Sequence, residues 1–530
     1  MEITIGLTSI TTSLACILVV GWLWNVVDWV WLRPKKMEKK LRKQGLKGNS
    51  YRLLFGDKKQ SVEMVRQTTS KPMDHFSNDY GPRILPFLHQ TISNYGEKSF
   101  IWEGPKPAVI ITQPELIREV LMKMRDFTKQ DSHALIKKLT NGLTRLEGEK
   151  WAQERKLINP AFHMDKLKHM LPAFYTSAQE TIDEWEKKTS KTGSHEVEMW
   201  SFLHDMSADA ISRAAFGSSF QEGRRVFELI REQITITLRA LQSVYIPGSR
   251  FLPTQTNRRM DKISKEIGAL VKDMIYRRKK AMEAGEAAKD DLLGVLLKSS
   301  FQGIQDNQHG NTKKIQNIKL SLKEVIEECK LFYLAGQDTT SSLLVWTLIL
   351  LSKHQEWQQQ AREEILNTFG SNRPDYEGLN QLKKMNMILY EVLRLYPPAN
   401  QLSRQVSHDI TLGDMQLPDG AILNLPMVYV HHNEKLWGPD AKEFQPERFS
   451  NGVLKATGGN MSFFSFGWGP RICIGSNFAM MEAKVTLALI LQRFSLELSP
   501  SYAHAPTVGN GTLRPQFGAQ IILHRLQIQN

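Results

Sequence analysis

The sequence predicts a mainly α-helical protein with small β-sheets, built as a single large helical domain that follows one N-terminal transmembrane helix. Three observations lead to this prediction. Residues 3–27 carry no charged side chain over 25 positions. From Glu149 onward, apolar residues recur mainly at helical spacing. The 530 residues are 41% hydrophobic and show no Pro/Gly/Ser-rich linker between two core-forming halves, which favours one large core.

The first element is expected to be a membrane anchor over residues 1–32. A helix of about 20 mostly apolar residues crosses a bilayer, and Ile3–Val27 exceeds that length. Four tryptophans gather at its end, where an interfacial belt would lie: Trp22, Trp24, Trp29 and Trp31. A cleavable signal peptide is the alternative, but no Lys or Arg precedes the apolar run and Glu2 gives the opposite charge bias.

A basic segment follows and is expected to be a juxtamembrane linker over residues 33–49. From Arg33 to Lys47 the chain has eight Lys and Arg residues and one acid, Glu38, which is +7 of the total formal charge of +14. Nucleic-acid binding is the alternative, but a basic patch directly after an apolar segment fits a membrane surface better. By the positive-inside rule, the main domain, residues 50–530, then faces the cytosol.

The cysteines and the glycosylation sequons bear on the compartment. Cys16, Cys329 and Cys473 show no spacing typical of a disulfide framework, which favours a reducing compartment for the main domain. The chain has two sequons, Asn460-Met-Ser462 and Asn510-Gly-Thr512. Neither is expected to be glycosylated if the domain is cytosolic.

The main domain is expected to begin with strands and to continue with helices. From Lys47 to about Phe127, short apolar runs mixed with Gly and Pro predict a small sheet with helical connections. The polar stretch Ser299–Lys319 lacks apolar periodicity and is expected to be a mobile loop. Ser321-Leu-Lys-Glu324 has the sequence of a capping box, and a long helix is expected from there to about His354. Its apolar second half, Leu343–Leu351, should cross the core.

The middle of that long helix breaks the apolar pattern with Ala335-Gly-Gln-Asp-Thr-Thr340. A glycine, an acid and two threonines are costly in a buried helix. A threonine hydroxyl can bond to the backbone carbonyl four residues back and bend the helix. A polar kink without chemistry and a reactive site are therefore both open interpretations of this segment.

The loop from Phe466 to Gly475, Phe-Gly-Trp-Gly-Pro-Arg-Ile-Cys-Ile-Gly, holds Cys473 two residues after Arg471 and just before a helix expected from about Ser476. Glycines let the backbone approach the sulfur closely. Backbone N–H groups that point at the sulfur are expected to lower its pKa and to favour the thiolate. This is the environment of a thiolate metal ligand, and a buried structural cysteine beside a Gly-rich turn is the alternative.

Five patterns, taken in order along the chain from Trp22 to the C-terminus, resemble the cytochrome P-450 family. They are Trp151-x-x-x-Arg155, Ala335-Gly-x-Asp-Thr-Thr340, Glu391-Val-Leu-Arg394, Pro446-Glu-Arg-Phe449 and the cysteine loop. Each short pattern is weakly specific, but all five in order leave little room for coincidence. The resemblance implies the cytochrome P-450 fold, with residues 50–530 as the catalytic domain.

The resemblance also implies a haem b whose iron is bound by the Cys473 thiolate. The resemblance implies that four residues bind the haem propionates: Trp151, Arg155, Arg404 and Arg471. It also implies a role in cofactor binding for Phe466 on the cysteine loop. The residues it implies in proton delivery to O₂ are Asp338 and Thr339. A buried charge network that serves folding and haem retention would consist of Glu391, Arg394 and Arg448.

Finer details resemble the plant P-450 family 72, whose members oxidise terpenoids. They include Lys47-Gly-Asn-Ser-Tyr-Arg52 and Glu327-Glu-Cys-Lys-Leu-Phe332, although the Pro-rich hinge of many microsomal relatives is missing after the anchor. The implied substrate is a triterpenoid, with a secologanin-type iridoid or a gibberellin as alternatives. A mostly apolar pocket is expected from the segments near Ser132–Thr144 and Thr512, and from five residues: Leu331, Leu334, Ala335, Ala399 and Leu402.

Because no flavin or Rossmann segment is evident in the chain, electrons are expected from outside it. The anchor and the family resemblance imply that they come from NADPH through a membrane-bound NADPH–cytochrome P-450 reductase. The reductase would dock on basic residues at or near the helix of Trp151, namely Lys150, Arg155, Lys156, Lys166 and Lys168. The protein is expected to be a monomer on the endoplasmic reticulum membrane, with a single pass and no nucleic-acid partner. A reductase-independent isomerase, against which Asp338-Thr339 argues, and a haem sensor remain alternatives.

Overall fold

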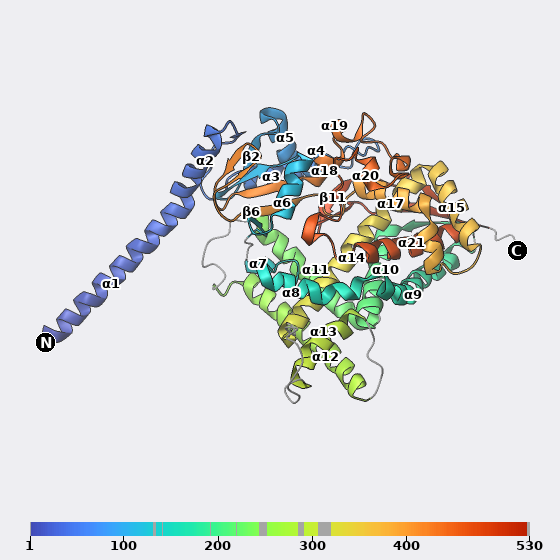
Figure 1. Cartoon of the computed structure of the whole chain (residues 1–530), viewed down its shortest axis with the longest axis horizontal. Coiled ribbons are helices and arrows are strands. Elements are labelled where there is room, and N and C mark those ends of the chain that lie inside the picture. Colours follow the sequence, from blue (N-terminus) through green and yellow to red (C-terminus); the bar gives the residue numbers. More distant parts are fainter. Residues whose placement is uncertain are drawn as a thin grey trace.

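The computed structural model describes residues 2–130, 134–139, 141–190, 192–218, 220–242, 252–284, 291–305 and 320–526. Helices dominate the body, and a sheet lies at the end of the molecule from which the N-terminal helix leaves (Figure 1). The expectation of a mainly helical fold with small sheets is therefore confirmed.

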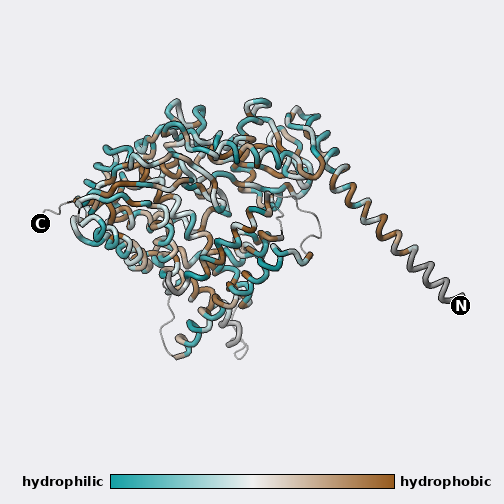
Figure 2. The backbone as a smooth tube through the Cα atoms, turned by 180° about the vertical axis from the view of Figure 1, so that it is seen from behind, coloured by the Kyte–Doolittle hydropathy of each residue, from teal (hydrophilic) through white to brown (hydrophobic). Residues whose placement is uncertain are grey.

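The N-terminal helix α1 (Glu2–Val27) extends away from the body and continues through a π-helical turn (Asp28–Leu32) into α2 (Arg33–Lys43). Figure 2 shows apolar residues along the part of α1 that is coloured. Among the described residues, one helical stretch, Cys16–Lys43, is long and apolar enough to cross a membrane. The apolar part of this stretch is not buried against the rest of the protein. This stretch fits a membrane anchor.

Helix α2, which covers most of the expected juxtamembrane linker, is packed onto the body. Met37 and Leu41 of α2 are buried in a core that they share with the sheet. The basic side chains of α2 reach acids of the main domain, with Arg33–Asp419 at 3.0 Å and Lys40–Asp409 at 2.5 Å. An i, i+4 apolar pair on an otherwise basic helix explains this, because it provides a narrow stripe that can be buried.

The main sheet has six strands in the order β1-β2-β3-β9-β6-β4. Their bounds are β1 (Lys47–Gly48), β2 (Ser99–Glu103), β3 (Lys106–Ile110), β4 (Phe127–Thr128), β6 (Leu402–Val406) and β9 (Ile422–Leu425). The β1–β2 and β3–β9 pairs are parallel and the others are antiparallel. The expected early sheet is confirmed, but two of its strands come from the distant C-terminal third of the chain.

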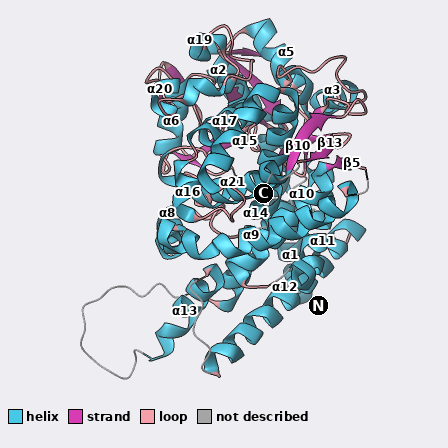
Figure 3. Cartoon of the chain, turned by 90° about the vertical axis from the view of Figure 1, so that its right-hand side faces the viewer, coloured by secondary structure: helices cyan, strands magenta, loops and turns pink. Residues whose placement is uncertain are grey.

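The remaining strands form smaller sheets. A three-stranded sheet has the order β10-β13-β5, which Figure 3 shows side by side. Two antiparallel pairs complete the set, β7–β8 and β11–β12. The bounds are β5 (Ser194–Glu198), β7 (Ile410–Leu412), β8 (Met415–Leu417), β10 (Phe494–Leu498), β11 (Pro506–Gly509), β12 (Thr512–Pro515) and β13 (Gln520–Arg525).

The helices of the body that exceed ten residues surround the core. Their bounds are α3 (Lys58–Thr68), α8 (Gly148–Ile158), α9 (Met164–Thr189), α10 (Met199–Ile211), α11 (Phe220–Gln242), α12 (Gln255–Glu283), α13 (Leu292–Gln305), α14 (Leu322–Lys353), α15 (Gln355–Phe369), α17 (Lys383–Leu395) and α21 (Ser476–Arg493). The shorter ones are α4 (Gly81–Ile84), α5 (Pro86–Tyr95), α6 (Pro114–Met122), α7 (Ala134–Leu139), α16 (Tyr376–Gln381), α18 (Met427–His431), α19 (Glu434–Trp437) and α20 (Val453–Ala456).

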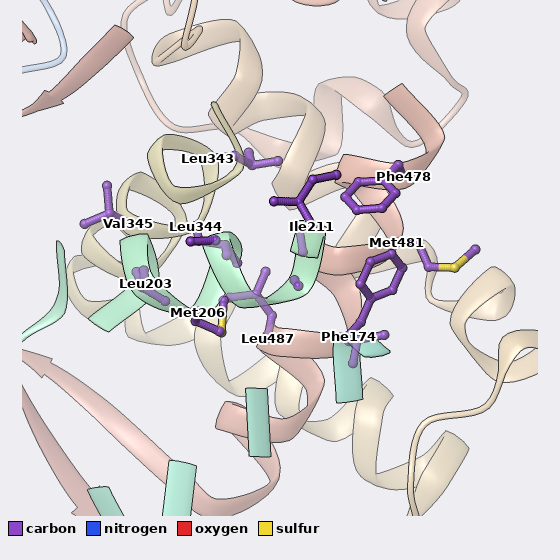
Figure 4. Packing of buried hydrophobic residues seen from close by; sticks show 14 of the residues in the cluster. Phe174, Leu203, Met206, Ile211, Leu343, Leu344, Val345, Phe478, Met481 and Leu487 are labelled. Atoms are coloured by element: carbon purple, nitrogen blue, oxygen red, sulfur yellow. The ribbon is translucent and has the colours of Figure 1, made fainter. Parts of the chain in front are cut away.

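Helix α14 crosses the core as the sequence predicts. Ser321 forms the N-terminal capping box with Glu324, and the helix runs unbroken to Lys353. Its apolar second half is buried and packs with α10 and α21 (Figure 4). Burying one side chain of the size of leucine stabilises the fold by about 1.5–3 kcal/mol relative to leaving it in water, so this contact holds α14 firmly in place.

The expectation of a loop over Ser299–Lys319 is wrong for the first part of that range. Helix α13 continues to Gln305, and the Ser299 hydroxyl donates to the carbonyl of Leu296 at 2.7 Å. Buried leucines upstream, at 292, 293, 296 and 297, keep one face of this helix in the core, and the helix propagates from there. The rest of the expected loop, residues 306–319, lies outside the described residues.

Candidate functional site

The cysteine loop is closed on itself and packed against α6. The backbone N–H of Cys473 donates to the carbonyl of Phe466 at 2.8 Å. Gly469 has a φ of +71°, and a Cβ there would lie 2.8 Å from the sulfur of Met122 and 3.0 Å from the carbonyl oxygen of Leu121. A glycine is therefore required at 469 both for backbone conformation and for space. Just beyond the loop, α21 begins at Ser476, as expected.

The Cys473 side chain is accessible to solvent, yet the protein packed around it raises the pKa of the thiol above its ordinary value by desolvation. The N–H of Gly475 and the Arg155 guanidinium lower that pKa, but burial outweighs both. The expectation of a lowered pKa is therefore wrong for the thiol itself. A metal cation would add the positive charge that one N–H group and one arginine do not supply.

Three arginines expected near a cofactor gather from separate elements beside the cysteine loop. The guanidinium of Arg471 donates to a Glu147 carboxylate oxygen at 2.5 Å and lies 4.6 Å from the ring centre of Trp151. Arg404, on β6, is buried and donates to the carbonyl of Ser403 at 2.8 Å. Arg155, one turn after Trp151 on α8, is close enough to Cys473 and Arg471 for each to affect its pKa.

Lys129 is a member of this group that the sequence motifs did not reveal. Burial lowers the pKa of its ammonium to about 7, and repulsion from Arg404 and Arg471 adds to the effect. Burial and Arg471 likewise lower the pKa of Arg404 to about 10, while Glu147 opposes the change. Lys129 directly follows the two-residue strand β4, where only its pairing with β6 indicates its place.

Among the described residues, which leave out 131–133, the cationic cluster of Lys129, Arg155, Arg404 and Arg471 has little negative charge around it. Glu147 is the carboxylate that acts on three of its four members, whereas the cations depress one another's pKa. Buried positive charge is stable only when paired. The cluster therefore fits a bound group that carries more than one negative charge. Together with the thiol of Cys473, these residues fit a haem, whose two propionates are anionic and whose iron takes a thiolate.

Helix α14 has a short accessible stretch where its apolar pattern breaks down: Ala335 is exposed, and Leu334 and Thr339 are half-buried. Ala399 and Leu402 are also half-buried, whereas Leu331 is almost completely buried in the main core. Four of the five residues expected in a substrate pocket are therefore open to some degree, and Leu331 is a packing residue.

Separate structural features explain why a glycine and a threonine occur in this stretch of α14. A Cβ at Gly336 would lie 2.7 Å from the Ile211 side chain, because α10 packs closely against α14 at this point. The Thr339 hydroxyl donates to the carbonyl of Ala335 at 2.7 Å, the bond expected for a threonine in a helix. The helix is nevertheless continuous through this segment.

Asp338 and Thr339 interact with different parts of the protein. The Asp338 carboxylate is buried and lies 2.7 Å from Nε2 of His204 on α10. His204 is not part of any motif in the sequence, and only the packing of α10 on α14 reveals it.

The expected charge network lies together in the core. Glu391 and Arg394 are fully buried, and two bonds of 2.7 Å join the guanidinium to the carboxylate. Arg448 reaches the same carboxylate at 3.4 Å and pairs with Asp440 at 2.9 Å. Arg394 also donates to the carbonyls of residues 431, 441 and 443. The network therefore ties α17 to the segments that lead toward the cysteine loop.

A surface pocket of about 370 Å³ lies on α8 and the turn after it, lined by Trp151, Ala152, Arg155, Lys156, Asn159, Pro160 and His163. Of the basic residues expected to attract a partner here, Lys150 pairs with Glu324 at 2.5 Å and Lys168 with Glu377 at 2.6 Å. Lys156 lines the pocket and is exposed. Lys156 is therefore better placed than Lys150 or Lys168 to meet a partner.

Comparisons with known proteins agree with this site. The family model "Cytochrome P450" matches residues 79–523. Cytochrome P450 CYP72A219 of Panax ginseng is 53% identical over 527 residues, which cover 99% of this chain and 100% of that protein. Echinocystic acid 23-monooxygenase of Saponaria officinalis is 50% identical, covering 97% and 99%, and cytochrome P450 72A15 of Arabidopsis thaliana is 48% identical, covering 99% and 100%.

The chain therefore belongs to the cytochrome P450 family, whose members hold a thiolate-ligated haem and generally use a redox partner and a small-molecule substrate. Within that family it is a monooxygenase of the plant 72A group.

Proposed function

We propose that this protein oxidises a triterpenoid, using O₂ and electrons from NADPH–cytochrome P450 reductase. The observation that carries the proposal is the Cys473 thiol beside a largely buried cationic cluster, for which the described residues supply one nearby carboxylate, Glu147. The substrate class is supported by the 50% identity, over nearly the whole chain, to a protein named for echinocystic acid, which is a triterpenoid.

Cys473 would hold the haem iron, and the cationic cluster would hold the propionates. When bound, a thiolate-ligated haem supplies the activation of O₂, because the thiolate pushes electron density toward the iron. Trp151 supports the guanidinium of Arg471 from one face, and the Phe466 carbonyl fixes the backbone of Cys473. The Glu391–Arg394–Arg448 network is assigned to folding and to retention of the haem, since it is buried and fully paired.

Asp338 and Thr339 would manage protons at the oxygen-binding side of α14. The Thr339 hydroxyl is half-buried beside the exposed Ala335, so it can meet a bound molecule. A hydroxyl both donates and accepts, and a carboxylate accepts and then returns a proton. The two side chains together therefore provide what a proton transfer to bound O₂ requires.

The substrate would lie against Leu334, Ala335, Ala399 and Leu402. These side chains are apolar and accessible, as a terpenoid skeleton requires, and they would exclude water from the reaction. A small side chain at Ala335 leaves room near Thr339, whose hydroxyl lies one helical turn away.

The membrane and partner assignments extend the proposal. The anchor would hold a single-pass monomer on the endoplasmic reticulum membrane with its catalytic domain in the cytosol, supported by the exposed apolar helix and the basic α2. The reductase would dock over α8, where Lys156 is exposed beside the surface pocket.

A spectral screen tests the proposed substrate class. The purified protein is titrated with triterpenoid acids including echinocystic acid, with iridoids and with gibberellins, and the shift of the Soret band is recorded. We expect a type I shift with a triterpenoid acid and, with reductase and NADPH, a product heavier by one oxygen atom. A shift and product only with an iridoid or a gibberellin would overturn the triterpenoid assignment. Isomerisation of an added hydroperoxide, together with no oxidised triterpenoid when O₂, reductase and NADPH are supplied, would overturn the proposal and favour a reductase-independent isomerase.

A further inference from the structure

The Asp338 carboxylate is bound by a histidine from a neighbouring helix. Nε2 of His204, on α10, lies 2.7 Å from Oδ1 of Asp338, and both side chains are 8% exposed. The two helices are held in this register by a second contact, in which the Ser341 hydroxyl meets the carbonyl of Leu203 at 3.3 Å. The contact is therefore part of a rigid helix pair and does not depend on a flexible loop.

The other nitrogen of His204 shows which tautomer is present. Nη2 of Arg231 and Nε2 of Gln337 each lie 3.1 Å from Nδ1. The Gln337 amide nitrogen also donates to the His204 carbonyl at 3.2 Å, which fixes the orientation of the amide. Arginine has no acceptor atom, so Nδ1 must accept and carry no proton. His204 is therefore a neutral imidazole that donates its Nε2 proton to Asp338.

Some of the charged groups around His204 favour its neutral form and others favour its protonated form. Burial lowers the pKa of His204, and Arg231 on α11 adds to this, but Asp205 and Asp338 raise it above its ordinary value overall. Asp205 lies 3.9 Å from Nδ1. On β12, Arg514 acts electrostatically with Asp338. The contact with Arg231 favours the neutral ring, whereas the two carboxylates make a second proton easy to add.

Arg231 connects this buried group to solvent. Its side chain belongs to an exposed residue of α11, so it can leave Nδ1 and become hydrated at little cost. A proton can then bind at Nδ1, where Asp205 is within reach. Once His204 is an imidazolium, it attracts the Asp338 carboxylate more strongly and holds it more firmly against α10.

We propose that His204 is the positioning residue of Asp338: it holds the carboxylate on the α10 side of α14 and, by its charge, sets how firmly that carboxylate is held there. The inference rests on the proposed role of Asp338 and Thr339 in proton delivery. It makes one residue outside the sequence motifs responsible for coupling, which is the share of NADPH electrons that ends in oxidised product rather than in hydrogen peroxide.

The test compares His204→Phe and His204→Gln with the wild type, using full-length holoprotein, the same reductase, and echinocystic acid as the probe substrate. The measurement is hydrogen peroxide released per NADPH consumed, with and without the probe, from about pH 6 to about pH 8. For His204→Phe we expect kcat for coupled turnover to fall by about tenfold or more, the low end of what a positioned proton-transfer group contributes. KM for the probe should be unchanged.

His204→Gln distinguishes positioning from simple packing. Its amide can still donate to Asp338 but cannot become charged, so coupling should stay near that of the wild type while its pH dependence disappears. In the wild type we expect coupling to fall as the pH drops and the imidazolium forms. A pH dependence in His204→Gln equal to that of the wild type would overturn the proposal.

A second measurement does not involve turnover. Because the folded-state pKa of His204 is raised, its stabilising contribution is present below its unfolded pKa and is lost as the pH rises through the folded value. The difference in Tm between the wild type and His204→Gln should therefore shrink toward high pH. His524→Gln, which removes a surface pair with Glu497 at 2.8 Å, is the matched control and should leave coupling unchanged.

Thr339→Ala separates this inference from the proposed function. If Thr339→Ala leaves peroxide release unchanged, the proton-delivery role of the Asp338–Thr339 pair is wrong. If Thr339→Ala raises peroxide release and His204→Phe does not, only the inference about His204 is wrong. In every variant, the reduced CO spectrum shows whether the fold and the Cys473 ligand are intact.

Discussion

At the scale of single residues, the thiol of Cys473 shows how an environment can differ from what its motif indicates. One N–H group and one arginine are too few to offset burial, so the free thiol has a raised pKa. The thiolate therefore depends on the metal that it would bind.

Replacing Cys473 by alanine should abolish the Soret band of the reduced CO complex that is typical of thiolate ligation. The matched control is Cys329→Ala. Cys329 is a fully buried packing residue that is distant from Cys473 in the sequence, so its replacement should leave the band in place. Difference spectra of both variants provide the measurement. An unchanged band in Cys473→Ala would contradict its role as the ligand.

A second residue-scale prediction concerns Glu154 on α8 and Glu328 on α14. Each has a buried oxygen without a donor among the described residues, Oε1 of Glu154 and Oε2 of Glu328, and one shared proton would satisfy both. Burial and Glu154 raise the pKa of Glu328 to about 9. The folded state thus binds more protons than the unfolded chain, and stability should fall as the pH rises from about 4.5 to about 9.

Glu328→Gln should remove most of this pH slope, because its amide can still accept from the Leu143 N–H and can donate to Glu154. Urea unfolding over that pH range measures the effect. Glu149→Gln, an exposed change on the same α8, should keep the slope of the wild type. If the pH dependence of stability persists in Glu328→Gln, it does not arise from the Glu154–Glu328 pair.

At the scale of elements, the Glu391–Arg394 pair fixes α17 to the chain that leads toward the cysteine loop. Arg394→Ala should destabilise the fold by about 3–5 kcal/mol, because the fully buried Glu391 carboxylate loses its bidentate partner and keeps Arg448 at 3.4 Å and the N–H of Gln445 at 2.9 Å. Thermal unfolding and haem content measure the loss. Arg66→Ala, which breaks the exposed pair with Glu63, is the control and should change neither.

Elements also differ in how far local sequence predicts them. Helix α14 follows from its capping box and its long apolar run, both of which act within one turn or one face. Helix α13 extends farther than its polar C-terminal residues indicate, because leucines one to two turns upstream are buried by neighbouring helices. The basic charge of α2 indicates a linker, whereas its four buried residues, Pro34, Met37, Glu38 and Leu41, give little apolar signal because one of them is an acid.

At the scale of the whole molecule, the orientation on the membrane is open to a direct test. Expression of the full chain in a eukaryotic secretory system should yield protein whose gel mobility does not change on treatment with a glycosidase. The sequons at Asn460 and Asn510 would be out of reach in the cytosol. A mobility shift that is lost in Asn510→Gln or Asn460→Gln would place the domain in the lumen and reverse the assignment.

The sequence alone determined the features that depend on short-range patterns. The apolar N-terminal run, the start of α14, the helix after Cys473 and the order of five motifs all follow from spacing within a few residues. These patterns were enough to indicate the cytochrome P450 family and to name candidate residues for its site.

Only the tertiary structure decided which side chains from distant segments meet. Lys129 joins Arg404 because β4 pairs with β6 across more than 270 positions, and His204 meets Asp338 because α10 packs on α14. Neither contact leaves a local signal, since a lysine after a strand and a histidine in a helix have many ordinary surroundings. Burial then alters the pKa of each group, and burial is a property of the folded chain alone.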